Sequence, residues 1–274
     1  MSDAPDFSAR ALERALNGLP LGQPLHFFAA IGSTNDEARR LAEAGAPEGT
    51  LVVANEQTAG RGRAGRAWQT PRGAALAASF ILRPRLKPAR LGRVTMLGGL
   101  ATAEAIENVT GRRTLLKWPN DVLMDERKVA GVLAESAIIG DRIAHVVLGI
   151  GINANAGPAG PVQYPAASLA EIIGRPVDRA GLLVALSRRL GRWYAEIGGE
   201  ALQEAWQARL AWKGRQVTVQ TGASVLEGLA QEVDADGSLI LRLASGELAA
   251  VVAGDVSLRL ADDPTEAEGR DKRP

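Results

Sequence analysis

Residues 57–70 form the segment of this chain best suited to chemistry. The sequence QTAGRGRAGRAWQT places Arg61, Arg63 and Arg66 within six positions, separated by glycines and an alanine. Like charges so close repel one another, and glycines lose much chain entropy when they are ordered. Guanidinium groups bind carboxylates and phosphates strongly, and glycine lets backbone N–H groups approach phosphate oxygens. The segment is either a solvated basic loop or an anion-binding loop, and we favour the anion site.

Two other interpretations of this segment fit the residues less well. GRGRAG at 60–65 satisfies the G-x-G-x-x-G pattern, but a dinucleotide-binding fold needs a helix to begin there. Instead, Trp68 and Pro71 follow in a turn before another apolar stretch. An RGG-like nucleic-acid segment would be disordered, with aromatic residues interleaved over a longer tract. Trp68 is the only aromatic residue between positions 57 and 70, so we do not favour that alternative.

A second group of polar residues lies in the KWPND segment at positions 117–121. Pro-Asn-Asp is ordinary turn chemistry, so a plain turn is the simplest interpretation. In a binding site, Lys117 can contact a phosphate, while Asn120 and Asp121 offer oxygens to Mg²⁺ or a nucleotide. Lys128 follows shortly afterwards, just before an apolar stretch. A lysine in that position usually only guards an exposed strand against aggregation.

The GIGIN segment at 149–153 ends a strongly apolar stretch with two glycines and an amide. Glycine in a strand permits close approach of a ligand or of another backbone, and Asn153 supplies a polar group. Alone, this pattern indicates little. His26 and His145 are isolated from each other and from any metal-ligand spacing, so we expect both to be structural.

Helical and extended patterns alternate along most of the chain. Residues 143–153 form an almost unbroken apolar run, which is typical of a strand buried on both faces. The alternation predicts an α+β fold, a mixed sheet with helices packed on it. The expected helices span 8–17, the stretch from Ser33 or Thr34 to Gly45, 90–108, 179–197 and 200–210, and the expected strands span 50–57, 74–84, 114–119, 128–138 and 143–153.

The pattern changes near residue 212 to short strands separated by the turn signals DADGS and ASGE. Leu239, Leu241 and Leu243 alternate to one face of such a strand. We expect a small β-barrel over 212–260. Residues 261–274 carry eight charges in fourteen positions, and we expect that tail to be disordered.

Composition narrows the class of protein. The 274 residues are 46% hydrophobic and 23% charged, as in an ordinary globular protein with room for one large domain and one small one. A net charge of +1 argues against a protein built to hold duplex DNA. The absence of cysteine excludes disulfides and thiolate metal sites. We find neither a secretion signal nor an apolar stretch long enough for a bilayer, and therefore expect a cytoplasmic protein.

The ordered combination of motifs is far more specific than any one of them. STN at 33–35, QTAGRGRAGRAW at 57–68, KWPND at 117–121, KVAGVLAE at 128–135 and GIGIN at 149–153 together resemble biotin protein ligases. The resemblance extends from about Leu25 to Leu260. It implies an N-terminal helical lead-in over 1–24, a class II synthetase-like catalytic domain over 25–211, and an SH3-like barrel over 212–260. Some members carry an N-terminal DNA-binding arm, for which we expect no room here.

The resemblance also implies an activity. Such enzymes activate biotin with ATP and Mg²⁺ as biotinyl-5′-AMP, then transfer it to a lysine of a biotin carboxyl carrier protein. The substrate's own carboxylate is the nucleophile, so no Ser, Cys or His is required. We expect a monomer or homodimer that binds neither DNA nor membrane. A lipoate or octanoate ligase or transferase of the same fold is the alternative, and a structural β-barrel adaptor would account for 212–260 alone.

By this resemblance each motif takes a role at the site. The predicted catalytic residues are Lys128, Arg63 and Asp121, the last also a candidate Mg²⁺ ligand. The predicted biotin-binding residues are Ser33, Thr34, Asn35, Gln57, Arg61, Gly62, Arg63, Lys128, Gly131 and Gly151. The predicted adenylate-binding residues are Arg61, Arg63, Arg66, Trp68, Lys117, Asn120, Ile152 and Asn153. We expect residues 60–70 to become ordered on ligand binding. YPAASL at 164–169 departs from the usual Thr-Ser-Leu, which leaves open the role of a hydroxyl at Ala167.

Overall fold

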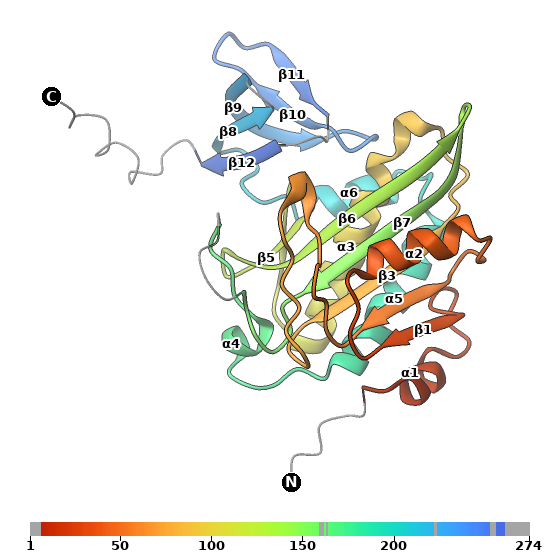
Figure 1. Ribbon diagram of the computed structural model, residues 1–274. Coiled ribbons are helices and arrows are strands. Elements are labelled where there is room, and N and C mark those ends of the chain that lie inside the picture. The colour runs from red at the N-terminus through yellow and green to blue at the C-terminus, as the bar shows by residue number, and fades with distance from the viewer. Residues whose placement is uncertain (1–6, 159–161, 163, 222–223, 253–255, 261–274) are drawn as a thin grey trace, which may run out of the picture.

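Two sheets of unequal size organise the chain. The computed structural model describes residues 7–158, 162, 164–221 and 224–252, together with the backbone of 256–260. Within these residues, a seven-stranded mixed sheet with helices on both faces is followed by a five-stranded antiparallel sheet (Figure 1). This arrangement confirms the predicted α+β fold with a small β-structure at its C-terminal end.

The larger sheet has the strand order β1-β2-β3-β7-β6-β5-β4. β1 and β2 pair in parallel, and the remaining neighbours pair in antiparallel fashion. The long central strands carry the register on which the site depends, with Gly131 opposite Gly151. The strands are β1 (Leu25–Phe28), β2 (Leu51–Ala54), β3 (Leu76–Leu82), β4 (Leu115–Lys117), β5 (Asp121–Met124), β6 (Arg127–Ile139) and β7 (Arg142–Ile152).

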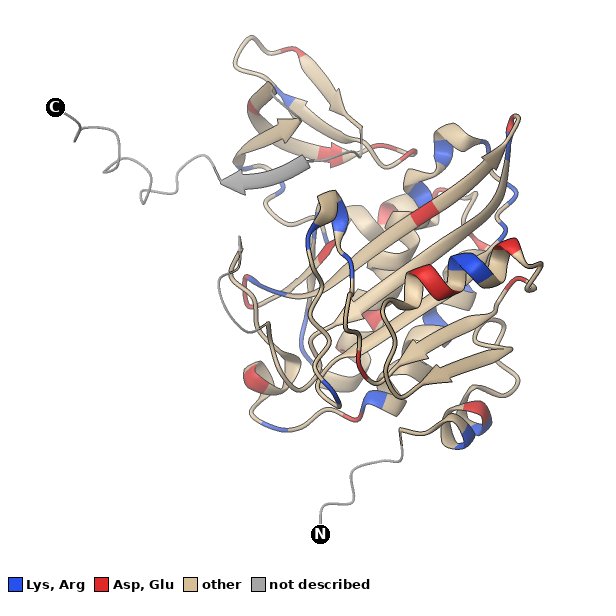
Figure 2. Cartoon of the chain, in the orientation of Figure 1, with Lys and Arg blue, Asp and Glu red and all other residues tan. Residues whose placement is uncertain are grey.

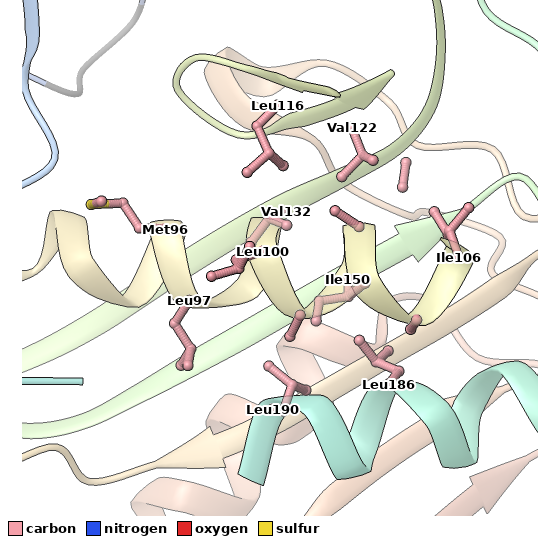
Figure 3. Packing of buried hydrophobic residues seen from close by; sticks show 14 of the residues in the cluster. Met96, Leu97, Leu100, Ile106, Leu116, Val122, Val132, Ile150, Leu186 and Leu190 are labelled. Carbon is pink, nitrogen blue, oxygen red and sulfur yellow. The ribbon is translucent and has the colours of Figure 1, made fainter. Parts of the chain in front are cut away.

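Helices cover both faces of this sheet. The helices are α1 (Ala9–Leu16), α2 (Thr34–Glu43), α3 (Gly92–Thr110), α4 (Leu169–Ile173), α5 (Arg179–Ala195) and α6 (Ala201–Gln207), with short 3₁₀ turns η1 (Arg63–Gly65) and η2 (Pro88–Arg90). Helices α3 and α5 pack on one face and form the main core with alternate strand residues (Figure 3). Helix α2 packs on the opposite face with a small cluster that includes Ala38, Val52 and Val147.

The smaller sheet has the order β11-β10-β9-β8-β12. Leu239 and Leu241 of β10 are fully buried, and Leu243 packs against the core, as the alternation predicts. The side chains of the last strand lie outside the described residues, as does the tail at 261–274. The strands are β8 (Gln216–Thr221), β9 (Ser224–Val233), β10 (Leu239–Arg242), β11 (Leu248–Val251) and β12 (Val256–Leu260).

Most predicted elements are present, and the differences are local. Strand β1, of four residues, and helix α4, of five residues, were not predicted. The strand expected over 114–119 ends at Lys117, where a turn leads into the unpredicted strand β5. No helix within the described residues is long and apolar enough to cross a membrane.

Helix α3 approaches the sheet most closely at Gly98. A Cβ atom there would lie 2.8 Å from Val132 Cγ1 and 3.0 Å from Leu148 Cδ1. At the neighbouring Gly99, a Cβ atom would meet Leu116 Cδ2 at an ordinary 3.5 Å. The helix therefore packs against β6 and β7 through a position that has room for hydrogen alone.

Gly98→Ala should consequently lower the free energy of unfolding by about 1 kcal/mol, because overpacking outweighs the gain in helix propensity. Gly99→Ala is the matched control and should raise it by up to about 1 kcal/mol. Urea unfolding followed by circular dichroism measures both. Equal stabilisation of the two variants would contradict this account of the packing.

Candidate active site

A cavity of about 490 Å³ opens on the face of the larger sheet that carries α2. Its walls come from the N-terminus of α2, the arginine segment, the turn after β4 and the ends of β6 and β7. With one exception, every predicted site residue lines it: Ser33, Thr34, Asn35, Gln57, Arg61, Gly62, Arg63, Arg66, Trp68, Lys117, Asn120, Asp121, Lys128, Gly131, Gly151 and Asn153.

The exception is Ile152. Its side chain is fully buried in the main hydrophobic core and does not line the cavity. The reason is the two-residue period of a strand, since Gly149 and Gly151 face the cavity while the side chain of Ile152 points to the opposite face of the sheet. A contact of Ile152 with the adenylate therefore stays a prediction, and its side chain is directed away from the cavity.

A buried polar network joins the N-terminus of α2 to the sheet. Gln57 Oε1 accepts hydrogen bonds from Thr34 N at 2.8 Å and Thr34 Oγ1 at 3.0 Å. Ser79 Oγ donates to Asn35 Oδ1 at 2.6 Å and lies 2.8 Å from Thr34 Oγ1. Thr34, Asn35 and Ser79 are all at most 5% exposed. Buried polar groups hold their orientation when they are hydrogen-bonded, so this wall is preformed.

The arginine segment folds back on itself through backbone hydrogen bonds. Gly62 N donates to Arg66 O at 2.6 Å, and Trp68 N donates to Gly60 O at 2.8 Å. A Cβ atom at Gly60 would overlap the carbonyl oxygen of Trp68 and the amide of Gln57, so glycine is required by the close approach of the chain. Gly65 adopts φ 71° at the tip, which also favours glycine. The structure thus contains a tight loop whose glycines serve its own backbone.

Arg61 is held by acidic side chains at the rim of the cavity. Its guanidinium donates to both oxygens of Glu135, at 3.0 and 2.9 Å, and to Asp36 Oδ1 at 2.8 Å. Glu135 also accepts a hydrogen bond from Asn35 Nδ2 at 2.7 Å. Figure 2 shows acidic positions in red on α2 and β6 and basic positions in blue on the arginine segment. Glu135 therefore ties the arginine segment to the STN motif.

Trp68 lies on a floor of two glycines. Gly131 and Gly151 are register partners on β6 and β7. A Cβ atom at Gly151 would overlap the indole ring of Trp68, and one at Gly131 would lie 3.2 Å from it. The indole nitrogen is buried and has no hydrogen-bond partner among the described residues. Any larger residue at position 151 would displace the ring.

Two lysines converge on Asp121. Lys128 Nζ lies 2.6 Å from Asp121 Oδ1, and Lys117 Nζ lies 3.8 Å from Asp121 Oδ2. Burial lowers the pKa of Lys117. The negative charge of Asp121 raises this pKa, whereas the positive charge of Lys128 lowers it further. The Lys117 ammonium also lies 4.4 Å from the centre of the Tyr164 ring, a cation–π distance. The cluster carries a net positive charge beside the cavity.

The cavity offers few oxygen donors to a Mg²⁺ ion. No group of three His, Cys, Asp or Glu side chains that could hold a metal occurs among the described residues. Asp121, a carboxylate lining the cavity, is already paired with Lys128. Because Mg²⁺ commonly binds through one or two carboxylates plus substrate phosphates, the site suits an ion that arrives with a nucleotide. A direct bond from Asp121 to Mg²⁺ stays a prediction.

Several residues of the site were not predicted, and four of them have a clear structural part. Tyr164 and Trp118 line the cavity, whereas Ser79 and Glu135 hold the residues that do. Ser79 had a signal in the sequence, because it is a lone polar residue in an apolar strand. Tyr164 had none. At Ala167 the backbone carbonyl accepts a hydrogen bond from Asn153 Nδ2 at 3.2 Å.

Comparisons with known proteins agree with this geometry. Residues 27–153 match the biotin/lipoate A/B protein ligase family, and residues 214–259 match the biotin protein ligase C-terminal domain. The biotin–[acetyl-CoA-carboxylase] ligase of Paracoccus denitrificans is 36% identical over 228 residues, covering 80% of this chain and 94% of that protein. The chain belongs to the biotin protein ligase family.

Other members of the biotin protein ligase family are similar over comparable lengths. The bifunctional ligase/repressor BirA of Bacillus subtilis is 34% identical over 245 residues, which cover 87% of this chain and 75% of BirA. The structure of the biotin protein ligase from Aquifex aeolicus in complex with biotin and ATP superposes with a TM-score of 0.73. The two sequences are 29% identical, and the superposition covers 87% of this chain and 100% of the Aquifex aeolicus chain.

The contact between Glu135 and Arg61 makes a prediction about the loop. Glu135→Gln removes the charge that holds Arg61, so trypsin should cleave within 61–66 up to about fivefold faster, as for loss of a partly exposed ion pair. Glu37→Gln is the matched control, because that carboxylate pairs with Arg40 on the same helix. Mass spectrometry of the early fragments measures the rates. Equal cleavage of both variants and of the wild type would contradict a tethering role for Glu135.

Proposed function

We propose that this protein is an ATP-dependent biotin protein ligase, which forms biotinyl-5′-AMP and transfers the biotinyl group to a lysine of a carrier protein. The observation that carries the proposal is the cavity itself. Five cationic side chains, Arg61, Arg63, Arg66, Lys117 and Lys128, border it beside a preformed polar wall. Membership in the biotin protein ligase family supplies the identity of the ligands that such a cavity would take.

The first half-reaction joins two anions. An oxygen of the biotin carboxylate attacks the α-phosphorus of ATP, the bond to the bridging oxygen breaks, and pyrophosphate leaves. Because the two substrates repel each other, catalysis depends on positioning and on fixed positive charge. Lys128 and Arg63 are the residues we propose for the charge that develops on the α-phosphate. Asp121 holds the ammonium of Lys128 at the cavity, because Asp121 Oδ1 lies 2.6 Å from Lys128 Nζ.

The polar wall and the cationic side divide the cavity between the two ligands. Ser33, Thr34 and Asn35 offer hydroxyl and amide groups, and we assign them with Gln57 to the ureido ring of biotin. The residues proposed for the tail and carboxylate of biotin are Arg61, Gly62, Gly131 and Gly151, and those proposed for the nucleotide are Arg66, Trp68, Lys117, Asn120 and Asn153. Mg²⁺ would arrive with the ATP phosphates.

In the second half-reaction, an uncharged lysine amine attacks the acyl carbon and AMP leaves. Water would hydrolyse the same anhydride, so the adenylate must be covered. The contacts of the arginine segment with Glu135 and of Trp68 with its glycine floor support our proposal that this segment serves as that cover. The acceptor is a biotin carboxyl carrier domain. The near-neutral net charge of +1 gives no support for binding duplex DNA.

A lipoate ligase is the alternative within the same fold. The family that matches residues 27–153 includes lipoate enzymes in its description. The match of residues 214–259 to the C-terminal domain of biotin protein ligases favours biotin instead. The relatives cited above are also described as biotin ligases.

Mass spectrometry of the protein incubated with ATP, Mg²⁺ and one acid tests the function directly. With biotin, we expect bound biotinyl-5′-AMP, and adding a carrier domain should move the biotinyl group to one lysine. With lipoate in a parallel sample, we expect no adenylate. If lipoate alone forms an adenylate, the enzyme is a lipoate ligase, and if neither acid does, the proposal fails.

The role of Lys128 makes a quantitative prediction. Lys128→Ala should slow pyrophosphate release in the presence of biotin by about a hundredfold or more, as expected when one group stabilising developing charge is lost. Lys87→Ala, an exposed residue that caps no helix through its side chain, should release pyrophosphate normally. Both variants should unfold at the wild-type temperature within a few degrees. Near-normal release by Lys128→Ala would remove this residue from the catalytic set.

A further inference from the structure

The turn between β9 and β10, residues 234–238, reaches the back of the candidate active site. Gly237 O accepts a hydrogen bond of 2.8 Å from the indole Nε1 of Trp118. Trp118 is 2% exposed and lies in the turn that joins Lys117 to Asn120. Gly237 itself does not line the cavity. A backbone carbonyl of the smaller sheet therefore fixes a tryptophan inside the KWPND segment.

The turn owes its shape to Asp234. The Asp234 carboxylate accepts hydrogen bonds from the backbone N–H groups of Asp236 at 2.9 Å and Ser238 at 2.8 Å. The backbone of Asp234 also bonds to Ser238 and Gly237. Gly237 adopts φ 95°, which side chains rarely tolerate. The carbonyl that meets Trp118 is thus aimed by an internal Asx-type turn.

The same turn is anchored to helix α3. Arg93, which is 1% exposed, donates to Ala235 O at 2.5 Å and to the carbonyl oxygens of Ile197 and Gly199. A Cβ atom at Gly92 would overlap the carbonyl oxygen of Asp236, so helix and turn are in backbone contact. The buried guanidinium of Arg93 therefore holds the turn through hydrogen bonds to backbone carbonyl groups.

Lys117 and Asn120 flank Trp118, and both line the cavity. Both residues belong to the same short segment as Trp118, so a shift of Trp118 passes along the backbone to Lys117, which lies in a strand only three residues long. The far end of the turn is tied to β6, because Asn120 Nδ2 donates to Val132 O at 2.8 Å. The wall formed by Thr34, Asn35 and Gln57 makes its hydrogen bonds to other elements. Displacing Trp118 would therefore disturb one side of the cavity and leave the other intact.

We propose that the 234–238 turn is a positioning element for nucleotide binding, which acts through the hydrogen bond from Trp118 to Gly237. This inference rests on the proposed function, since it assigns the Lys117–Asp121 side of the cavity to ATP. Asp234 and Gly237 are positioning residues, because they act through Trp118 and contact no substrate. The smaller sheet thereby contributes to ATP affinity from behind the pocket.

Asp234→Ala tests the proposal with two matched variants. Losing the carboxylate should raise the KM for ATP by about tenfold, the effect of one hydrogen bond, and leave the KM for biotin unchanged. Asp234→Asn retains an acceptor oxygen and should restore the wild-type KM. Asp236 lies in the same turn and forms an ion pair with Arg90 of η2. Asp236→Ala removes this ion pair but keeps the hydrogen bonds to the Asp234 carboxylate, so the variant should also have the wild-type KM for ATP.

Exchange of the Trp118 indole proton gives a readout that needs no activity. The nuclear magnetic resonance signal, assigned by its loss in Trp118→Phe, should exchange faster with deuterium in Asp234→Ala than in Asp236→Ala. In a double-mutant cycle, adding Trp118→Phe to Asp234→Ala should raise the KM for ATP no further, because both changes break one interaction.

These measurements separate the two claims. If the wild-type protein forms no adenylate, the proposed function fails and takes the nucleotide assignment with it. If the wild type is active and folded Asp234→Ala keeps its KM for ATP, or loses ATP and biotin affinity equally, only the positioning role is overturned. Faster indole exchange with an unchanged KM for ATP overturns it as well.

Discussion

Mutual repulsion among cations is the constraint on which this site depends. Five positively charged side chains border one cavity, so the fold must hold them together before any anionic ligand arrives. It does so with carboxylates placed among them. Asp121 lies between Lys117 and Lys128, while Glu135 and Asp36 hold Arg61. These acids reduce the repulsion without filling the cavity, which leaves positive charge available for a carboxylate and a triphosphate.

The seven-stranded sheet separates this polar chemistry from the hydrophobic core. Alternate residues of β3, β6 and β7 point toward α3 and α5 and are apolar, whereas the other face carries the polar Ser79 and the glycines of the cavity beside the small apolar cluster under α2. Gly149 and Gly151 leave room for Asn35 and Trp68, respectively, directly on the backbone. Because residues alternate between its faces, β7 contributes to the hydrophobic core on one side and to the floor of the cavity on the other. The smaller sheet contacts this site through the turn that contains Gly237, whose carbonyl accepts a hydrogen bond from Trp118.

Features that depend on residues close together in the sequence could be predicted, whereas contacts between residues far apart in the sequence could not. The motifs containing Arg61, Lys117 and Lys128 are recognisable because their charge and spacing are local properties of the chain. The assignment of Ile152 to the nucleotide stays a prediction, because a motif does not say which of its residues faces the ligand and the Ile152 side chain lies in the core. Glu135 was not predicted because its partners, Asn35 and Arg61, lie 100 and 74 positions away. Contacts at such separations leave no signal in a single sequence.

The amino-acid sequence by itself determined the α+β class, the small β-structure near the C-terminus, the helices and long strands, and the residues that gather at the cavity. Local periodicity, turn chemistry and the order of the motifs carry that information. Only the tertiary structure decided which acid pairs with which cation, which face of β7 forms the floor, and that Gly237 meets Trp118. Those facts depend on strand register and on the packing of distant segments, and a linear chain does not specify either until it folds.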